Sequence, residues 1–484
     1  MSFKRKLQLA TDFYQLSMGN VYYLDDKKNQ IAVFDLFIRK NPCKGGYTIV
    51  AGLEQIIEYI ENLHFDDEDI ALLKKNHPEF DDNYLEYLRN FSFSGEIYAI
   101  PEGTIVFPNE PLIRVKAPLI EAQLIETTML TMINHQSLIA TKASRIVDAA
   151  NGGIVLEFGL RRAHGSEAGL YGARASIIGG CTGTSNVETE YLIDMPSKGT
   201  MSHSLVQSYD SELEAFRSYA KYNPDNLILL VDTYDTLHSG VPNAIKVFQE
   251  LKEKNALENH YGIRLDSGDL TYLSKSARKM LDEAGFTDAI ISASSDLDEY
   301  IIRDLKLQGA TIDSWGVGTK MITSYDCPAL GAVYKLSQIE EKGQTKPKIK
   351  ISNDAVKITN PGYKKVVRFY DKDTNMALAD LIMLDHEKIN ENEPLEIFDP
   401  VYTWKRTVLT NFYYQDLLVP IFMNGKKVYE SPKMKEIQKY AQDQKKSIGQ
   451  EYHRLLNPHV YHVDLSKKLW DLKQELIQQN HYTK

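Results

Sequence analysis

Four apolar runs in the second third of the chain each end in a short cluster of Asp, Ser, Thr and Gly, and a segment with helical spacing follows. They are LILLVDTYDT (227–236), GIRLDSGD (262–269), AIISASSDLD (289–298) and IDSWGVGT (312–319). A buried parallel strand is a continuous run of Val, Ile and Leu, and α/β proteins place ligand groups at the carboxyl ends of such strands. The pattern predicts an α/β enzyme whose substrate carries phosphate.

The alternation of strand, polar turn and helix recurs about seven times in the middle of the chain, counting also GIVLEFG, SIIGGCTGTSN and MPSKGTMSHS. Parallel strands need helical crossovers, so this rhythm favours an α/β barrel or a doubly wound sheet, of which we expect an irregular barrel. The domains we predict are an N-terminal α+β lobe (1–120), an α/β barrel catalytic domain (121–340) and a C-terminal extension of β-hairpin and helices packed on both (341–484).

Composition narrows the class of protein. The 484 residues carry a formal net charge of −10, and 43% of them are hydrophobic. No apolar stretch reaches the roughly 18 residues of a membrane span, and Thr11, Asp12 and Gln15 interrupt any signal-peptide core. Three scattered cysteines suit a reducing compartment, so we expect a cytoplasmic protein. The negative charge argues against general nucleic-acid binding, and an anionic ligand must therefore meet a local basic pocket.

The segment LDSGD places Asp266 and Asp269 after a strand that also carries Arg264. Two carboxylates beside a guanidinium can orient a ribose, hold Mg²⁺ through water or stabilise a developing positive charge. The alternative is a helix N-cap, because Asp and Ser side chains accept hydrogen bonds from free main-chain amides.

Small residues in two other segments suit a phosphate group. Ser294, Ser295, Gly316, Gly318 and Thr319 could surround a sugar phosphate with main-chain amides at a helix start. The sequence contains neither the complete G-x-G-x-x-G fingerprint in GVGTKM nor G-x-x-x-x-G-K-[ST], so Rossmann and Walker-type nucleotide binding are not predicted.

Two further clusters offer chemistry. His203 stands between two serines, where an imidazole can ligate phosphate, act as a general acid or accept a phosphoryl group, although a lone His is more often an ordinary, partly buried residue. In EFGLRRAHG, Phe158 precedes Arg161 and Arg162. An aromatic ring and guanidinium groups suit a flat, negatively charged ring, whereas the alternative is a surface Arg pair beside a core Phe.

Nine segments, in order from Thr11 to about Leu336, resemble the nicotinate phosphoribosyltransferase family. They are TDFYQLSM, FDLFIRKNP, EFGLRRAHG, GGCTGTSN, GTMSHS, LLVDTYDT, GIRLDSGD, SSDLDE and GVGT. The resemblance implies a type II phosphoribosyltransferase fold and transfer of phosphoribosyl from 5-phosphoribosyl 1-pyrophosphate (PRPP) to nicotinate, giving nicotinate mononucleotide and pyrophosphate in NAD salvage. It also implies ATP hydrolysis through a phosphohistidine, a need for Mg²⁺ with protein ligands unknown, and a homodimer with active sites at the subunit interface.

Matched position by position, the resemblance also implies roles for individual residues. His203 is the residue phosphorylated by ATP, and Tyr14 and Phe158 sandwich the pyridine ring, Tyr14 arriving from the partner subunit. Arg161 faces the nicotinate carboxylate with Thr200 and Ser185. Related nicotinamide enzymes carry an Asp at the position of Ser185, and an Asp would repel a carboxylate substrate.

The remaining roles concern the phosphoribosyl donor. Arg264 and Asp266 attend the ribose and the reaction centre, and Arg39 of the neighbouring chain contacts pyrophosphate or nucleotide. Gly316, Gly318 and Thr319 bind the 5′-phosphate.

Three alternatives remain open at this point. A sibling phosphoribosyltransferase would use nicotinamide or quinolinate. A barrel aldolase or isomerase would use Lys335 as a Schiff-base amine at a strand end. A sugar-phosphate sensor would bind the ligand without catalysis.

Overall fold

The computed structural model describes residues 5–354 and 357–480. Its contacts group the chain into two compact units: unit 1 comprises Met1–Leu138 and Ala329–Lys484, and unit 2 comprises Ile139–Pro328. The division by contacts therefore falls near residues 138 and 328, whereas the sequence pattern suggested 120 and 340. Unit 1 is assembled from the two ends of the chain.

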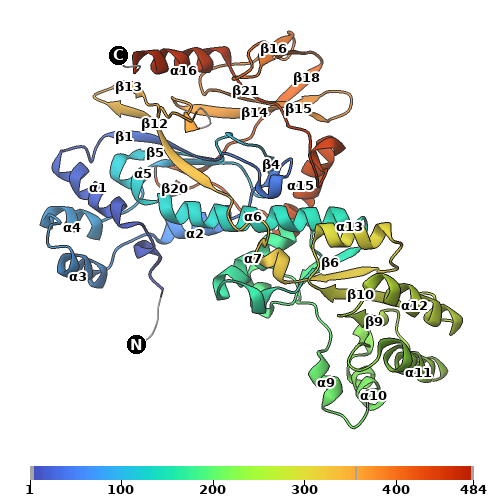
Figure 1. The fold of residues 1–484 in the computed structure, drawn as a ribbon. Coiled ribbons are helices and arrows are strands. Elements are labelled where there is room, and N and C mark those ends of the chain that lie inside the picture. Colours follow the sequence, from blue (N-terminus) through green and yellow to red (C-terminus); the bar gives the residue numbers. More distant parts are fainter. Residues whose placement is uncertain (1–4, 355–356, 481–484) are drawn as a thin grey trace. The chain divides into compact units, whose positions relative to one another are not determined.

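Unit 2 is built on a parallel sheet of six strands in the order β7-β6-β11-β10-β9-β8 (Figure 1). The strands are β6 (Ile154–Glu157), β7 (Gly183–Thr184), β8 (Leu227–Leu230), β9 (Tyr261–Leu265), β10 (Ile290–Ser295) and β11 (Ser314–Val317). Strands β8 and β11 are buried along their whole length, as the uninterrupted apolar runs predict. The irregular α/β barrel is confirmed as a curled, open parallel sheet.

Helices connect these strands and cover the sheet. They are the end of α6 (Glu126–Ala150), α7 (Ser166–Ile178), α8 (Glu190–Ile193), α9 (His203–Gln207), α10 (Glu212–Tyr222), α11 (Val241–Glu253), α12 (Leu270–Glu283), α13 (Glu299–Leu307) and α14 (Thr319–Ile322). The polar clusters after the strands start several of them: Asp269 caps α12 by accepting from the amide of Tyr272 at 2.8 Å, and Asp298 caps α13. The N-cap alternative is therefore correct for Asp269.

Two of the predicted strand segments have other structures. The residues of SIIGG end α7 and its following turn, so the strand in that region is only the two residues of β7. The segment 195–202 of MPSKGTMSHS is irregular. These segments are rich in Pro, Gly and Ser, which interrupt the hydrogen bonds between strands, and they contain too few apolar residues for a buried strand. The sheet therefore has six parallel strands, whereas we predicted about seven strand, turn and helix repeats.

Unit 1 contains an antiparallel sheet of seven strands in the order β13-β12-β1-β5-β3-β19-β20. The strands are β1 (Ile31–Ile38), β3 (Glu96–Ala99), β5 (Ile113–Pro118), β12 (Ala332–Glu341), β13 (Gln344–Pro347), β19 (Val419–Met423) and β20 (Lys426–Lys427). Central strand β1 pairs with β12 over its whole length, and the rings of Phe34 and Tyr334 stack at 4.7 Å. The partner β12 follows unit 2 in the sequence, whereas β1 precedes it.

A second sheet of unit 1 has the order β18-β14-β15-β21, with β14 (Lys364–Asp371), β15 (Ala377–Leu384), β18 (Phe412–Asp416) and β21 (Val463–Leu465). Two short pairs accompany it: β2 (Thr48–Ile49) with β4 (Ile105–Val106), and β16 (Leu395–Phe398) with β17 (Arg406–Leu409). An apolar core that includes Phe369, Leu381 and Phe412 fills the space between β14, β15, β18 and the β16–β17 pair.

The helices of unit 1 are α1 (Phe13–Leu24), α2 (Leu53–Asn62), α3 (Asp67–Asn76), α4 (Asp82–Arg89), α5 (Leu119–Leu124), the beginning of α6, α15 (Met434–Ser447) and α16 (Lys467–Gln479). The helices predicted in the C-terminal extension are confirmed as α15 and α16. Among the described residues, no helix is both long and apolar enough to cross a membrane.

Candidate active site

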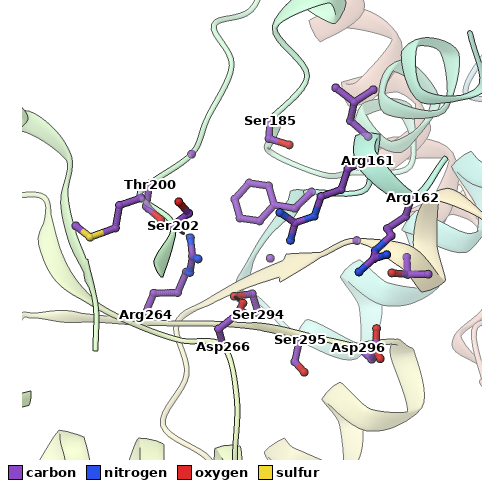
Figure 2. Close-up of a pocket in the computed structure, with 17 residues that line it drawn as sticks. Arg161, Arg162, Ser185, Thr200, Ser202, Arg264, Asp266, Ser294, Ser295 and Asp296 are labelled. Atoms are coloured by element: carbon purple, nitrogen blue, oxygen red, sulfur yellow. Dashed lines mark hydrogen bonds between the residues drawn. The ribbon is translucent and has the colours of Figure 1, made fainter. Parts of the chain in front are cut away.

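A cavity of about 670 Å³ in unit 2 opens at the carboxyl ends of the parallel strands (Figure 2). It collects eleven of the residues singled out from the sequence: Phe158, Arg161, Ser185, Thr200, Arg264, Asp266, Ser294, Ser295, Gly316, Gly318 and Thr319. These residues span 162 positions of the chain, and they meet because parallel strands end at the same edge of a sheet. The predicted convergence of the polar clusters is thus observed.

Phe158 forms an aromatic wall of the cavity. Its amide donates to the carbonyl of Val317 at 2.8 Å, which fixes the start of the loop after β6 to β11. The ring lies directly over Gly316, where an added Cβ would stand 2.6 Å from a ring carbon. Gly316 therefore leaves room for Phe158, and its contact with phosphate stays a prediction.

Three guanidinium groups, those of Arg161, Arg162 and Arg264, give this acidic protein a positive pocket. Arg161 belongs to the 3₁₀ turn Leu160–Arg162, and Arg264 projects from β9. Arg264 donates to the hydroxyl of Thr200, and its Nε, although buried, has no hydrogen-bond partner in the described part of the chain. Burial lowers the pKa of Arg264, and the nearby positive charge of Arg161 lowers it further. The carboxylates of Asp266 and Asp232 raise it, but they do not offset the effect of burial. An anion entering the cavity would relieve this electrostatic cost.

Asp266 lies one residue beyond β9 and accepts a hydrogen bond from the hydroxyl of Ser294. Figure 2 shows both side chains facing the space that Arg264 also borders. A carboxylate in this position can stabilise positive charge on a bound sugar.

His203 lies beside this group. Its Nδ1 is 3.1 Å from the hydroxyl of Thr233, and its Nε2 is 3.8 Å from Asp266 and 4.0 Å from Asp232. The imidazole is partly exposed, and its neighbour Ser202 lines the cavity. The structure therefore places a potential phosphoryl acceptor next to two carboxylates and the cavity mouth.

Asp232 is a site residue that the sequence analysis did not single out. Its Oδ2 accepts from the amide of Asp266 at 3.0 Å and from the hydroxyl of Ser267 at 2.6 Å, while its buried Oδ1 has no hydrogen-bond partner among the described residues. Both aspartates follow an apolar run that ends in a polar cluster, and this pattern could have identified Asp232. In the parallel register Leu230↔Arg264, Asp232 and Asp266 become neighbours at the same strand end.

The phosphate-suited residues Gly318 and Thr319 also line the cavity, and Gly318 lies against the main chain of Phe158. Gly318 and Thr319 begin α14, and the following Lys320 forms an ion pair of 2.8 Å with Asp298. Burial opposes ionisation of Asp298, yet the hydrogen bond and charge of Lys320 lower its pKa. Ser295 adopts φ = 149°, a backbone conformation that side chains disfavour, which is typical of functional sites.

Three residues from the sequence analysis belong to unit 1. Tyr14 is exposed on α1, Arg39 follows β1, and Lys335 lies on β12 with its amine donating to the carbonyl of Tyr334 at 2.7 Å. Burial lowers the pKa of Lys335, and the positive charges of Lys350 and Arg39 lower it further against Glu126. The sequence analysis named Arg39 and Lys335 separately but did not group them with Lys350 as one basic cluster. No lysine lines the cavity of unit 2, so a Schiff base there finds no support.

Among the described residues, no group of three or more His, Cys, Asp and Glu side chains forms a cage for a metal ion. The oxygens of Asp232 and Asp266 nevertheless fit a hard cation that keeps most of its ligands from water or phosphate, because Mg²⁺ commonly uses one or two carboxylates. The unpartnered Oδ1 of Asp232 supports this fit.

The fold and the cavity define a type II phosphoribosyltransferase. The human nicotinic acid phosphoribosyltransferase structure matches with a TM-score of 0.85 at 27% identity, covering 96% of this chain and 99% of that one. A nicotinate-nucleotide pyrophosphorylase from Pyrococcus furiosus shares the fold, with a TM-score of 0.70 at 23% identity over 92% of this chain and 98% of that one.

Sequence comparison specifies the family. The nicotinate phosphoribosyltransferase N-terminal domain matches residues 9–134, the family model 154–378 and the C-terminal domain 363–473. A Bacillus subtilis nicotinate phosphoribosyltransferase is 49% identical over 97% of this chain and 95% of its own, and one from Dictyostelium discoideum is 35% identical over 97% and 88%. The chain belongs to the nicotinate phosphoribosyltransferase family and is an enzyme of this type.

Proposed function

We propose that this enzyme transfers phosphoribosyl from PRPP to nicotinate, producing nicotinate mononucleotide and pyrophosphate. The observation that carries the proposal is that one cavity is lined by the ring of Phe158, the guanidinium of Arg161, the carboxylate of Asp266, and Gly318 and Thr319 at the start of α14. The ring nitrogen of nicotinate bonds to C1′ while the bond from C1′ to the pyrophosphate oxygen breaks. Pyrophosphate leaves with the electron pair.

The residues divide this task by chemistry. Phe158 stacks on the pyridine ring, and Arg161 pairs with the carboxylate beside the hydroxyls of Ser185 and Thr200. Asp266 stabilises the oxocarbenium-like sugar, and Arg264 orients the ribose. The ring nitrogen carries no proton, so no general base is required at the nucleophile. Asp232 and Asp266 would hold Mg²⁺, which when bound neutralises charge on pyrophosphate.

Phosphorylation of His203 by ATP forms the second part of the proposal. Transfer of the γ-phosphoryl group to imidazole releases ADP, and water later cleaves the phosphohistidine. The added charge of roughly −2 would reorganise the pocket so that PRPP binds tightly. The contact with Thr233 supports this assignment, because it holds the imidazole in one orientation.

We further propose a cytoplasmic homodimer that serves NAD salvage. Tyr14 and Arg39 would reach the cavity from a second copy, and the basic group of Arg39, Lys335 and Lys350 suits a pyrophosphate or nucleotide. The exposure of Tyr14 on α1 supports such a contribution.

The decisive assay mixes purified protein with nicotinate, PRPP, Mg²⁺ and ATP and omits each component in turn. We expect mononucleotide formation that ATP stimulates and that excess nicotinamide does not inhibit. A His203→Ala variant should lose ATP hydrolysis and phosphoryl incorporation while retaining slow transfer. Persistent labelling of that variant would refute the role of His203, and absence of nicotinate-dependent pyrophosphate release would refute the function.

A further inference from the structure

Glu157, the last residue of β6, is fully buried directly behind the cavity wall and does not itself line it. One carboxyl oxygen accepts from the main-chain amide of Gly159, and the other accepts from the hydroxyl of Thr184 at 2.6 Å. Glu157 and Thr184 are partners in the parallel register of β6 and β7. A single side chain therefore bonds to both segments that leave this end of the sheet.

Each of those segments carries residues of the cavity. Gly159 opens the turn that presents Arg161, with Phe158 immediately before it. Thr184 precedes Ser185, whose amide donates to the carbonyl of Glu157 at 2.9 Å. The hydroxyl of Thr184 also accepts from the amide of Asn186 at 3.0 Å. The spacing between the guanidinium of Arg161 and the hydroxyl of Ser185, which border the same cavity in Figure 2, depends on this carboxylate.

The charge of Glu157 is costly. Burial raises its pKa, and only the hydrogen bonds from Thr184 and Gly159 oppose the increase. In the described part of the chain no Lys or Arg forms an ion pair with it, whereas other buried carboxylates, such as Asp380, have such a pair. An apolar side chain would fill this space at lower cost. What the carboxylate adds is two directed hydrogen bonds, one to each segment.

We propose that Glu157 and Thr184 form a positioning pair that sets the distance between Arg161 and Ser185 and thereby determines how well the enzyme binds the base substrate. The proposal rests on the proposed transfer to nicotinate. Neither member of the pair lines the cavity, and among the described residues neither side chain hydrogen-bonds to Gly318 or Thr319.

The test compares the wild type with Thr184→Val, Thr184→Ser and Glu157→Gln. Valine matches the shape of threonine but removes the donor, so we expect KM for nicotinate to rise roughly tenfold, because small displacements of substrate-positioning groups are amplified in catalysis. KM for PRPP should change less than about twofold. Serine retains the hydroxyl and should restore nicotinate affinity. The KM of the double variant Glu157→Gln/Thr184→Val for nicotinate should not exceed that of the single variant with the higher KM, because both substitutions act on the same contact.

Thr182→Val is the matched control. Thr182 lies two residues earlier, and its hydroxyl bonds to the carbonyl of Val155 without contacting Glu157 or the cavity. This variant should keep both KM values. If Glu157→Gln fails to fold, the two Thr184 variants carry the test.

The outcomes separate the inference from the function. A wild type inactive with nicotinate removes the proposed function and this inference together. An active wild type whose Thr184→Val variant shows unchanged KM for nicotinate, or equal increases for both substrates, overturns only the inference. Calorimetric titration with nicotinate alone provides a readout independent of turnover.

Discussion

Two arginines, one fully buried in unit 1 and one partly buried in unit 2, differ in how their charge is balanced. Arg368 of unit 1 bonds to both carboxylate oxygens of Asp380, at 2.8 and 2.6 Å, and both side chains are fully buried. Arg264 of unit 2 bonds only to the hydroxyl of Thr200, and its Nε has no partner in the described chain. Burial opposes the charge of both, but Asp380 raises the pKa of Arg368, whereas the pKa of Arg264 is lowered.

The difference distinguishes a structural charge from a functional one. A charge that is fully matched inside the protein has little left to offer a ligand, and its removal affects folding. A charge that is buried and incompletely matched gains a partner when an anion binds. The same contrast identifies Asp232, whose buried Oδ1 accepts no hydrogen bond from the described residues, as part of the site.

The largest expected effect is the loss of stability when the buried ion pair of Arg368 and Asp380 is broken. Asp380→Ala leaves Arg368 charged and buried, so the free energy of unfolding should fall by about 3–5 kcal/mol, measured by urea denaturation. Asp416→Ala is the control, because Asp416 is half-exposed and pairs with Lys365 at 3.8 Å, so the loss should stay below about 1 kcal/mol. Similar losses for both variants would show that full burial of the pair is not what matters.

Arg264→Lys tests the other side of the comparison. Lysine keeps the charge but cannot reproduce the planar fork, so kcat/KM for transfer should fall about 100- to 1000-fold. The free energy of unfolding should change by less than about 1 kcal/mol, because only one hydrogen bond to Thr200 is lost. A loss of stability as large as that of Asp380→Ala would abolish the distinction between the two arginines.

The sequence predicted the site of unit 2 better than the architecture of unit 1, for a physical reason. Apolar runs that end in Asp, Ser and Gly contain both the strand and its functional end within a few residues. The pairing of β1 with β12 joins positions about 300 residues apart, and a local pattern carries no information on such a contact. The partnership of Arg368 with Asp380 was likewise invisible, although only a hairpin separates them.

Within the site, the polar residues were found and some of their contacts were not. Asp269 and Asp266 look equivalent in LDSGD, yet one caps α12 and the other borders the cavity. Gly316 stays a predicted phosphate contact, but the sequence did not reveal that it also leaves room for the ring of Phe158. Distinguishing these roles requires coordinates, since each depends on which face of a strand end a residue occupies.

Gly316→Ala tests whether this cavity wall tolerates a single methyl group. The added Cβ would stand 2.6 Å from the Phe158 ring, so the ring must move, and overpacking should cost about 1–3 kcal/mol of stability. We expect KM for nicotinate to rise while KM for PRPP is retained. Adding Phe158→Leu should recover stability without recovering nicotinate affinity. Equal recovery of both would show that Phe158 only fills space.

The smallest expected effect comes from backbone strain at Ser295 rather than from charge. It is an increase in the free energy of unfolding, whereas the variants above lower it or leave it nearly unchanged. Ser295 holds φ = 149° at the cavity, a conformation that costs about 1–3 kcal/mol for a residue with a side chain. Ser295→Gly should therefore raise the free energy of unfolding by about 1 kcal/mol, after the flexibility of glycine in the unfolded chain is subtracted. Ser292→Gly, on the same strand β10 but with ordinary backbone geometry, should lower it by about 0.5–1 kcal/mol. Differential scanning calorimetry of the two variants measures these changes in stability. If both variants are less stable than the wild type, the backbone of Ser295 is not strained. The unfavourable features of the site would then be only the incompletely paired charges of Arg264 and Asp232.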